Sequence, residues 1–293
     1  MELIIFMSKK QKGILFIILS AFCFSLMNMF VKLSGDLPSI QKSFFRNLVA
    51  VVVAAILLIR SGNSFRWQKG NLGLLVLRAS FGTIGILCNF YALSNMNLAD
   101  ASMLNKLSPF FVILFSYLFL KEKVSPVQTL CIVAAFVGSL FIIKPGFAFG
   151  SAFPAMIGVL GGLGAGAAYT AVRALSLRGE KGPFIVFFFS AFSCLVTLPS
   201  LLFDYTPMTL TQLLYLLLAG ICASGGQFAI TAAYANAPGS EISIYDYTIV
   251  IFAGLWSFLL WAEIPDALSI AGYVIIFASS LFIFLHNKKK TTA

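Results

Sequence analysis

Long runs of apolar residues recur along the whole chain and are separated by short polar connections. The runs are continuously apolar and do not alternate between apolar and polar positions, which favours helices over a β-barrel. A helix needs roughly 20 apolar residues to cross a bilayer core of about 30 Å. The pattern therefore predicts an all-α integral membrane protein with ten transmembrane helices. The predicted spans are residues 13–33, 40–59, 72–93, 98–119, 126–143, 154–174, 183–203, 211–233, 241–261 and 267–286.

The second half of the chain repeats the first half at an offset of 141 residues. Ser139-Leu140-Phe141-Ile142 recurs as Ser280-Leu281-Phe282-Ile283, so that 280 − 139 = 141. Each half holds five predicted spans, and this odd number inverts the second copy relative to the first. Many secondary transporters use such inverted repeats to build two gates around one central site. The predicted boundaries are 13–143 and 154–286 for two inverted five-helix repeats, and 1–12 and 287–293 for the tails.

Composition and charge placement agree with a membrane protein. The chain has 293 residues, of which 60% are hydrophobic and 10% are charged, with a mean hydropathy of +0.97. A soluble domain carries about 25% charged residues. Most of the 20 basic residues fall in segments that alternating spans would place on one side, which predicts a cell (cytoplasmic) membrane protein with both termini cytoplasmic. The net charge of +10 thus indicates topology and contact with membrane lipids, and no nucleic-acid partner is expected.

Neither a metal nor a cofactor is expected from the motifs. The five cysteines fall inside predicted spans without a CxxC pair, and His286 is the only histidine, so the sequence predicts no metal site and no disulfide. Walker, GxSxG and HExxH motifs are absent from the sequence, which argues against ATP-driven transport and against an enzyme. Met1–Phe6 is too short for a signal peptide and the first span shows no separate small-residue cleavage site, and the start residue is either Met1 or Met7. A homodimer is compatible with the sequence.

One polar cluster lies inside the fourth predicted span, where an ionisable group needs a partner or an aqueous cavity. Lys106 is about eight residues into that span, which is roughly 12 Å deep at 1.5 Å per residue. Pro109 has no N–H and its ring clashes with the carbonyl four residues earlier, that of Asn105. A kink, a freed carbonyl and an ammonium at one place favour a substrate site. The alternative is that Lys106 extends to the interface or forms a structural pair.

A second polar cluster occupies the same place in the second repeat. Asp246 lies about six residues into the ninth span between Tyr245 and Tyr247, and the offset aligns Asn105 with Asp246 and Lys106 with Tyr247. We therefore expect the two clusters to face each other across one cavity. A carboxylate in a partly dry cavity can take up a proton, which makes Asp246 a candidate for proton coupling. An Asp246–Lys106 ion pair that locks the halves together is the alternative.

Further polar residues inside the spans are weaker candidates. Arg78 lies seven residues into the third span, and it either lines the cavity or extends to the nearby interface. Arg46 stands near the outer end of the second span, which favours a structural or topological role. The residues that can bond either a solute or a neighbouring helix are Asn28, Asn89, Tyr91, Tyr169 and Gln227.

Some residues are interpreted as structural or hinge elements, a group that includes Pro109. The four-residue spacing of Gly158, Gly162 and Gly166 gives a smooth face for close helix packing, and that face can also slide during gating. The carboxylates that end the fourth and ninth spans lie near the start of a following helix, where the helix dipole favours a negative charge. They are Glu122 and Glu263.

The arrangement resembles the drug/metabolite transporter superfamily of the EamA type over about residues 13–285. The first copy carries Tyr91-Ala92-Leu93, Ser108-Pro109 and Leu120-Lys121-Glu122. The second carries Tyr234-Ala235 and Leu260-Trp261-Ala262-Glu263, but Ile249-Val250 replaces Ser-Pro, so the proline is not repeated. The resemblance implies transport of small metabolites through a central cavity, lined mainly by the third, fourth, eighth and ninth helices.

The predicted function is secondary active transport of a small polar or amphipathic metabolite by alternating access. The opposite charges of Lys106 and Asp246 suit a zwitterion, so an amino acid or a related compound is the favoured substrate. The resemblance alone favours export over import or exchange. An integral-membrane lipid-modifying enzyme is the competing class, but it predicts a carboxylate- or histidine-rich cluster near one interface, which the sequence lacks.

Overall fold

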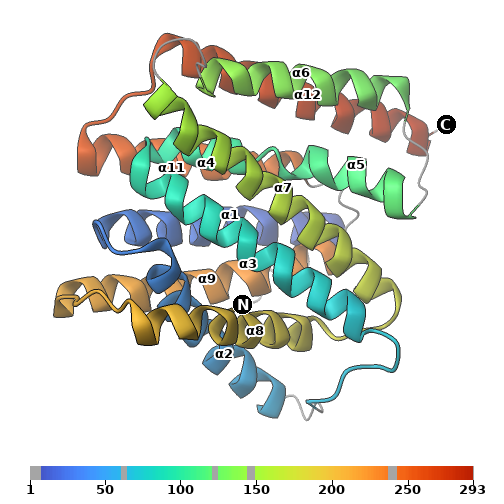
Figure 1. Cartoon of the computed structure of the whole chain (residues 1–293). Coiled ribbons are helices and arrows are strands. Elements are labelled where there is room, and N and C mark those ends of the chain that lie inside the picture. The colour runs from blue at the N-terminus through green and yellow to red at the C-terminus, as the bar shows by residue number, and fades with distance from the viewer. Residues whose placement is uncertain (1–7, 61–64, 121–124, 144–148, 237–242, 293) are drawn as a thin grey trace.

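The computed structural model describes residues 8–60, 65–120, 125–143, 149–236 and 243–292. Within these ranges every regular element is a helix, which confirms the predicted all-α class (Figure 1). The elements are α1 (Lys9–Leu33), α2 (Ser39–Arg60), α3 (Leu72–Asn95), α4 (Leu98–Asn105), α5 (Ser108–Leu120), α6 (Pro126–Ile143), α7 (Phe149–Leu177), α8 (Gly182–Phe203), α9 (Leu210–Asn236), the 3-10 helix η2 (Ser243–Tyr247), α11 (Thr248–Trp261) and α12 (Ala267–Thr292).

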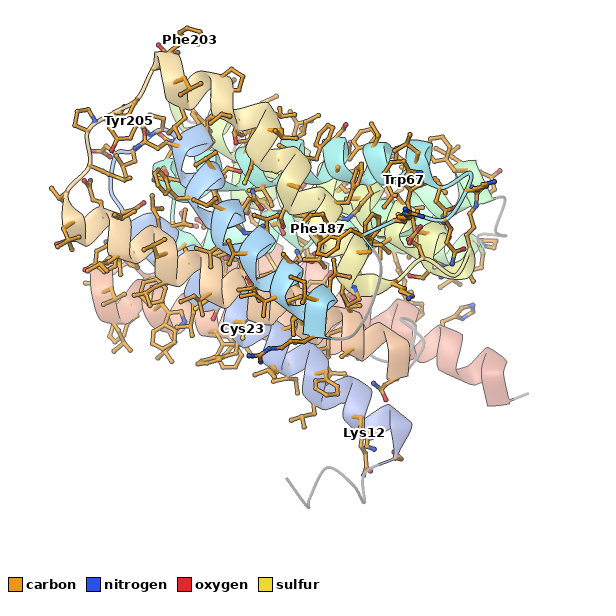
Figure 2. All side chains as sticks on the ribbon, turned by 90° about the horizontal axis from the view of Figure 1, so that it is seen from below. Lys12, Cys23, Trp67, Phe187, Phe203 and Tyr205 are labelled. Carbon is orange, nitrogen blue, oxygen red and sulfur yellow. The ribbon has the colours of Figure 1, made fainter. Side chains whose placement is uncertain are left out.

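Seven helical segments of the described chain are long and apolar enough to cross a membrane. Three shorter apolar stretches, Thr129–Ile142, Tyr245–Trp261 and Ala267–Ile283, fall on the remaining predicted spans. Large apolar side chains project from the outside of the bundle (Figure 2), and Phe203 is 86% exposed. So much exposed apolar surface is unusual for a soluble monomer and suits contact with lipid.

The principal helix pairs join the two halves of the sequence. α1 packs mainly against α9, α3 against α7, α2 against α8 and α6 against α12. In Figure 1, α6 and α12 lie side by side along one edge of the bundle, and α2 and α8 lie along the opposite edge. The halves are therefore interleaved, and the centre of the bundle is built from both.

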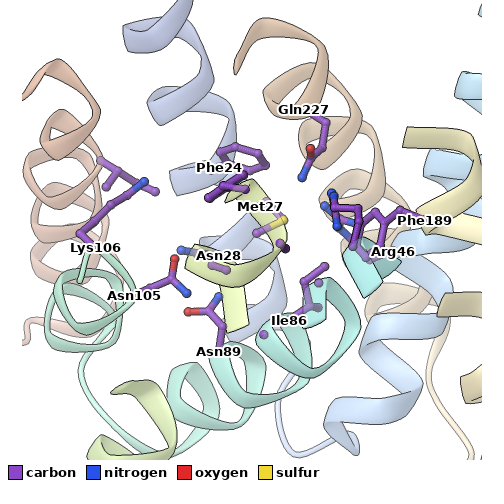
Figure 3. Close-up of a pocket in the computed structure, with 17 residues that line it drawn as sticks. Phe24, Met27, Asn28, Arg46, Ile86, Asn89, Asn105, Lys106, Phe189 and Gln227 are labelled. Carbon is purple, nitrogen blue, oxygen red and sulfur yellow. The ribbon is translucent and has the colours of Figure 1, made fainter. Parts of the chain in front are cut away.

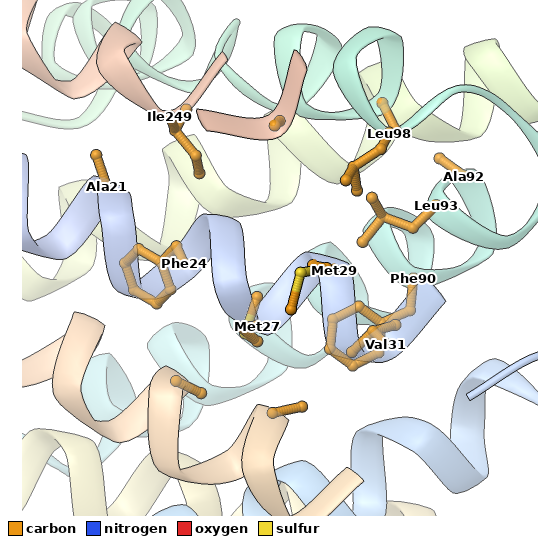
Figure 4. Close-up of a cluster of buried hydrophobic side chains, with 14 of the residues drawn as sticks. Ala21, Phe24, Met27, Met29, Val31, Phe90, Ala92, Leu93, Leu98 and Ile249 are labelled. Carbon is orange, nitrogen blue, oxygen red and sulfur yellow. The ribbon is translucent and has the colours of Figure 1, made fainter. Parts of the chain in front are cut away.

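The largest buried apolar cluster lies at this centre (Figure 4). Phe24 and Met27 of α1 belong to it together with Phe90 of α3 and Ile249 of α11. Phe24, Met27 and Ile249 also border the central cavity described below. The cluster thus forms one apolar wall of the cavity and holds α1 against the elements that carry its polar residues.

The fourth predicted span is not one kinked helix, because α4 ends at Asn105 and α5 begins at Ser108. Lys106 and Leu107 form the turn between them. Pro109 lies in the first turn of α5, where its missing N–H costs no helical hydrogen bond. The proline therefore starts a second helix, and the interruption is larger than the kink that we expected.

The ninth predicted span changes helix type at the matching place, although it has no proline there. Asp246 lies in the 3-10 turn η2 and not six residues into a continuous helix, and α11 begins only at Thr248. The Thr248 hydroxyl donates a 2.7 Å hydrogen bond to the Tyr245 carbonyl, which stabilises this change of helix type. The part of the predicted span before Ser243 lies outside the described residues.

Three glycines of α7 face the interrupted helix α4–α5. An added Cβ would lie 3.3 Å from the Leu104 side chain at Gly158, 2.9 Å from the Leu104 carbonyl oxygen at Gly162, and 2.5 Å from Phe111 Cβ at Gly166. The backbones can approach this closely only because these positions have no side chain. Whether this face also slides during gating stays a prediction.

Candidate functional site

A central cavity lies beside the α4–α5 turn, between helices of the two halves (Figure 3). Its water-accessible volume is about 80 Å³. The polar residues that line it come from α1, α2, α3, α4, the turn, α7 and α9, and they are Asn28, Arg46, Arg78, Asn89, Asn105, Lys106, Tyr169 and Gln227. The cavity therefore combines polar groups and apolar walls in the middle of an apolar bundle.

The most buried ion pair of the described chain joins the two halves at this cavity. Lys106 Nζ lies 2.5 Å from Asp246 Oδ2, and the two side chains are only 7% and 8% exposed. The other carboxylate oxygen, Asp246 Oδ1, is buried and has no hydrogen-bond partner among the described residues. Lys106 lines the cavity, whereas Asp246 stands behind it and reaches it through Lys106. The two predicted clusters thus meet directly, in the ion-pair arrangement.

The two tyrosines beside Asp246 point elsewhere. The Tyr247 hydroxyl donates a 3.0 Å hydrogen bond to the Lys106 carbonyl oxygen, and its ring packs edge-on against Phe277. Tyr245 is partly buried among apolar side chains. We expected both tyrosines to contact substrate, but neither lines the cavity. Consecutive residues of a helical turn face different directions, which separates them from Asp246.

Amide side chains supply most of the remaining polar lining. Asn28, Asn89, Asn105 and Gln227 all border the cavity. The Oδ1 atoms of Asn28 and Asn89 are buried and have no hydrogen-bond partner among the described residues. Tyr91 was predicted with them, but it packs edge-on against Phe153 instead of lining the cavity. The amides can therefore bond a polar solute from several sides.

Arg46 differs most from its predicted position. We favoured a structural or topological role near the outer end of the span, but Arg46 is 1% exposed and lines the cavity, as does Arg78 at 3% exposed. Asn47 holds the guanidinium through its Oδ1 atom and is itself bonded to Ser193 of α8. The sequence contains a usable signal, since Ser43 and Asn47 are four residues apart and mark a polar face of α2 beside Arg46.

A second ion pair closes one end of the bundle. Lys32, at the end of α1, lies 2.7 Å from Glu263, which follows α11, and Ser257 also donates to Glu263. We expected Glu263 to act as a helix cap, but Asp266 has that role, because it accepts a 2.8 Å hydrogen bond from the Ser269 backbone N–H. Glu122, its predicted counterpart, lies outside the described residues.

A buried carboxylate that sequence reasoning missed joins connections at the opposite helix ends. Glu180, between α7 and α8, accepts hydrogen bonds from the Gln68 backbone N–H at 3.1 Å and from the Asn71 side chain at 3.0 Å. Gln68 also donates a 2.8 Å bond to the Gly179 carbonyl. Polar contacts between the two halves therefore occur at both ends of the bundle and at its centre.

The chemistry of the site is that of binding. No group of three or more His, Cys, Asp or Glu side chains that could hold a metal ion occurs in the part of the chain that the structure describes. The cavity instead offers guanidinium, ammonium and amide groups, which bind polar solutes through hydrogen bonds and charge. Such a buried polar site in a multi-pass helical membrane protein is typical of membrane transporters.

The chain belongs to the EamA-like transporter family, which matches it over residues 11–144 and again over 153–285. It is 36% identical over 269 residues to the pseudopaline exporter CntI of Pseudomonas aeruginosa (strain UCBPP-PA14), covering 91% of this chain and 93% of the exporter. Human solute carrier family 35 member G1 is 29% identical over 283 residues, covering 92% of this chain and 78% of that protein. The predicted resemblance is confirmed, and the protein is a membrane transporter and not an enzyme.

A solved crystal structure shares the fold. It superposes with a TM-score of 0.69 at 15% sequence identity and covers 94% of this chain and 98% of the other. The interleaved helices are therefore an arrangement that a chain of low sequence identity also adopts.

Proposed function

We propose that this protein is a secondary active transporter of the cytoplasmic membrane that exports a small polar metabolite by alternating access. Ten spans form two inverted five-helix repeats, residues 13–143 and 154–286, with both termini in the cytoplasm. The favoured substrate is an amino acid or a related compound. A homodimer stays a prediction, which the mass of the protein in detergent would test.

The observation that carries the proposal is the cavity beside irregular helix segments from both halves, the α4–α5 turn and the 3-10 start of α11. Lys106 of the turn and Tyr247 at the end of η2 are 141 residues apart, and the Lys106–Asp246 pair joins the two segments. Interrupted helices at the centre of a membrane bundle are typical of substrate sites in secondary transporters. Irregular backbone is tolerated at that depth where protein or a cavity satisfies it.

The helix pairing supports two repeats. The 141-residue offset carries α1 onto α7 and α3 onto α9. The α1–α9 pair is therefore the counterpart of the α7–α3 pair, and both are principal contacts. The second match of the family, over residues 153–285, supports the same division.

The polar contacts at the two ends support alternating access. In the proposed topology the Lys32–Glu263 pair closes the outer end, and the hydrogen bonds of Glu180 to Gln68 and Asn71 close the inner end. The Lys32–Glu263 pair is partly exposed and can exchange its partner for water at modest cost, because an exposed ion pair contributes only about 0–1 kcal/mol. The two ends can then open in turn around the same cavity.

In this mechanism Lys106 and Asp246 form the coupling pair. Proton uptake by Asp246 removes the negative charge that holds Lys106, and the ammonium becomes available to the cavity. Binding and release of the proton at Asp246 therefore change the affinity of the site for substrate. The name of the Pseudomonas relative, an exporter, supports outward movement of the substrate.

Transport in inside-out vesicles tests the proposal. Inside-out vesicles that contain the protein would be given a panel of labelled amino acids and related metabolites. An acidic lumen would supply the driving force. We expect accumulation of at least one compound, because protons leaving the lumen drive the substrate in. Asp246→Asn should lose the response to the pH gradient, and Tyr245→Phe is the matched control. Accumulation no greater than in protein-free vesicles across the panel would contradict the proposal.

A further inference from the structure

The cavity contains two buried guanidinium groups without acidic partners. Arg46 of α2 and Arg78 of α3 both line it, and neither has an ion pair with a carboxylate among the described residues. The Nε atoms of both are buried and lack hydrogen-bond partners within those residues. An arginine cannot shed its proton at neutral pH, so both charges persist inside the bundle.

The surroundings hold the guanidinium groups in place without neutralising them. The guanidinium carbon of Arg78 lies 4.0 Å from the ring centroid of Phe189, and that of Arg46 lies 6.0 Å from the same ring. Arg78 also lies directly over Gly82, where an added Cβ would collide with its Nη1 atom. An aromatic face attracts a cation, but it supplies no negative charge. Two like charges that share one ring repel each other, so the site favours a bound anion.

The acidic side chain beside the cavity, Asp246, is already paired with Lys106 and not with the arginines. Figure 3 shows Arg46 and Phe189 on one side and Lys106 on the opposite side, with Asn28, Asn89 and Asn105 between them. Asp246 forms the ion pair with Lys106 there. With two arginines, one lysine and one aspartate, the formal charge around the cavity is +2. A ligand with a charge near −2 would balance it.

We propose, on the basis of the transport function above, that the substrate is a small anion with at least two carboxylates. One carboxylate binds Arg46 and Arg78, whose planar N–H forks match carboxylate geometry. The second lies among the amides, next to Lys106. Cationic groups at both sides of the cavity favour an elongated dicarboxylate over a compact oxyanion such as inorganic phosphate. Acidic amino acids and larger amino-carboxylates belong to this class.

Binding to the purified full-length chain tests the proposal. Succinate, malate and glutamate would be compared with the neutral analogue succinamide, the diamine putrescine and inorganic phosphate, by calorimetry and thermal shift. We expect the dicarboxylates to bind at least about tenfold more tightly than the other three. Arg46→Gln and Arg78→Gln should each weaken dicarboxylate binding about ten- to a hundredfold, as the loss of charged hydrogen bonds predicts. Arg66→Gln, in an exposed loop, is the control and should bind normally.

The stability of the ligand-free variants separates binding from folding. Removing an uncompensated buried charge should leave the unfolding temperature of Arg78→Gln equal to or above that of the wild type. A lower unfolding temperature with undiminished dicarboxylate binding would overturn the proposal. So would tighter binding of phosphate, succinamide or putrescine than of every dicarboxylate.

A failure of the anion assignment and a failure of the transport proposal give different results. If the wild type transports a neutral or cationic metabolite, and Arg46→Gln and Arg78→Gln keep the full rate, the anion assignment is wrong while the transport function stands. If dicarboxylates bind through the arginines but no compound crosses the membrane, the anion site stands and the transport mechanism is wrong.

Discussion

The Tyr247 hydroxyl donates a 3.0 Å hydrogen bond to the backbone carbonyl oxygen of Lys106, its own counterpart at the 141-residue offset. This carbonyl is left without its usual helical partner by the α4–α5 turn, because the Phe110 N–H bonds to the Leu107 carbonyl instead. The interrupted helix of one half is therefore completed by a side chain of the other. Such a contact couples the two halves at the point where the charged pair also joins them.

Tyr247→Phe should destabilise the protein. It removes only the hydroxyl and leaves the Lys106 carbonyl buried without a partner, which costs about 1–3 kcal/mol. Denaturation in detergent, monitored by circular dichroism, measures the change. Tyr245→Phe is the matched control, since its ring only packs among apolar residues, and it should unfold like the wild type. Equal stability of both variants would show that the hydroxyl contributes nothing.

Asp246→Asn and Lys106→Met should each destabilise the protein more strongly. Breaking a buried ion pair leaves one charge uncompensated, at a cost of about 3–5 kcal/mol. The double variant removes both charges and should recover most of that loss. It should nevertheless fail to transport, because it has neither a proton acceptor nor an ammonium at the cavity. Transport by the double variant at the wild-type rate would reduce the pair to a structural contact.

Glu263→Gln should open the end of the bundle that Lys32 closes. Their side chains are 12% and 28% exposed, so the pair contributes less than a buried one. A loss of about 0.5–1 kcal/mol shifts the population toward the open form about two- to fivefold. Labelling of Asn28→Cys by a membrane-impermeant thiol reagent, in a chain without its native cysteines, measures this shift.

Two further variants test whether this change depends on charge. Reversal of the pair, Lys32→Glu with Glu263→Lys, should restore slow labelling, because the attraction is re-formed. Asp204→Asn alters an exposed carboxylate after α8 and should leave the labelling rate unchanged. Fast labelling in the reversed pair would mean that closure depends on other contacts.

The helices could be predicted because a run of about 20 apolar residues indicates a helix that crosses the lipid bilayer. Irregular points within the helices were harder to predict, since Pro109 marks the α4–α5 turn but the change from η2 to α11 carries no proline. There the change of helix type depends on contacts with distant residues, such as the bond from Tyr247 to Lys106. Local sequence does not contain that information.

The site could be predicted only in part, because the sequence does not show in which direction each side chain points. Depth along a helix pointed to Lys106 and Asp246, which the structure brings together, but depth alone allowed Arg46 to point either outward or inward. Packing against Phe189, and the bond from Asn47 to Ser193 of α8, decide that direction. Tyr91 was predicted with Asn89, yet two residues along a helix are about 200° apart, so they cannot face the same cavity.

Gly166→Ala should destabilise the contact of α7 with α5. An added Cβ would lie 2.5 Å from Phe111 Cβ and 2.9 Å from the Ser108 carbonyl oxygen, and backbone atoms cannot move aside cheaply. Overpacking of this kind costs about 1–3 kcal/mol. Gly254→Ala is the matched control, because nothing lies within 4 Å of its added Cβ. Since alanine favours a helix over glycine by roughly 0.5–1 kcal/mol, this control should raise the stability.

Unfolding temperature and transport rate, measured on the same preparations, separate the two roles of the glycine face. A lower unfolding temperature for Gly166→Ala and a higher one for Gly254→Ala would establish close packing of α7 on α5. Gly166→Ala could instead fold as stably as the wild type but transport more slowly. The added methyl would then obstruct only other conformations of the transport cycle, and the glycine face would be needed for movement. Equal shifts in both variants would contradict the close approach itself.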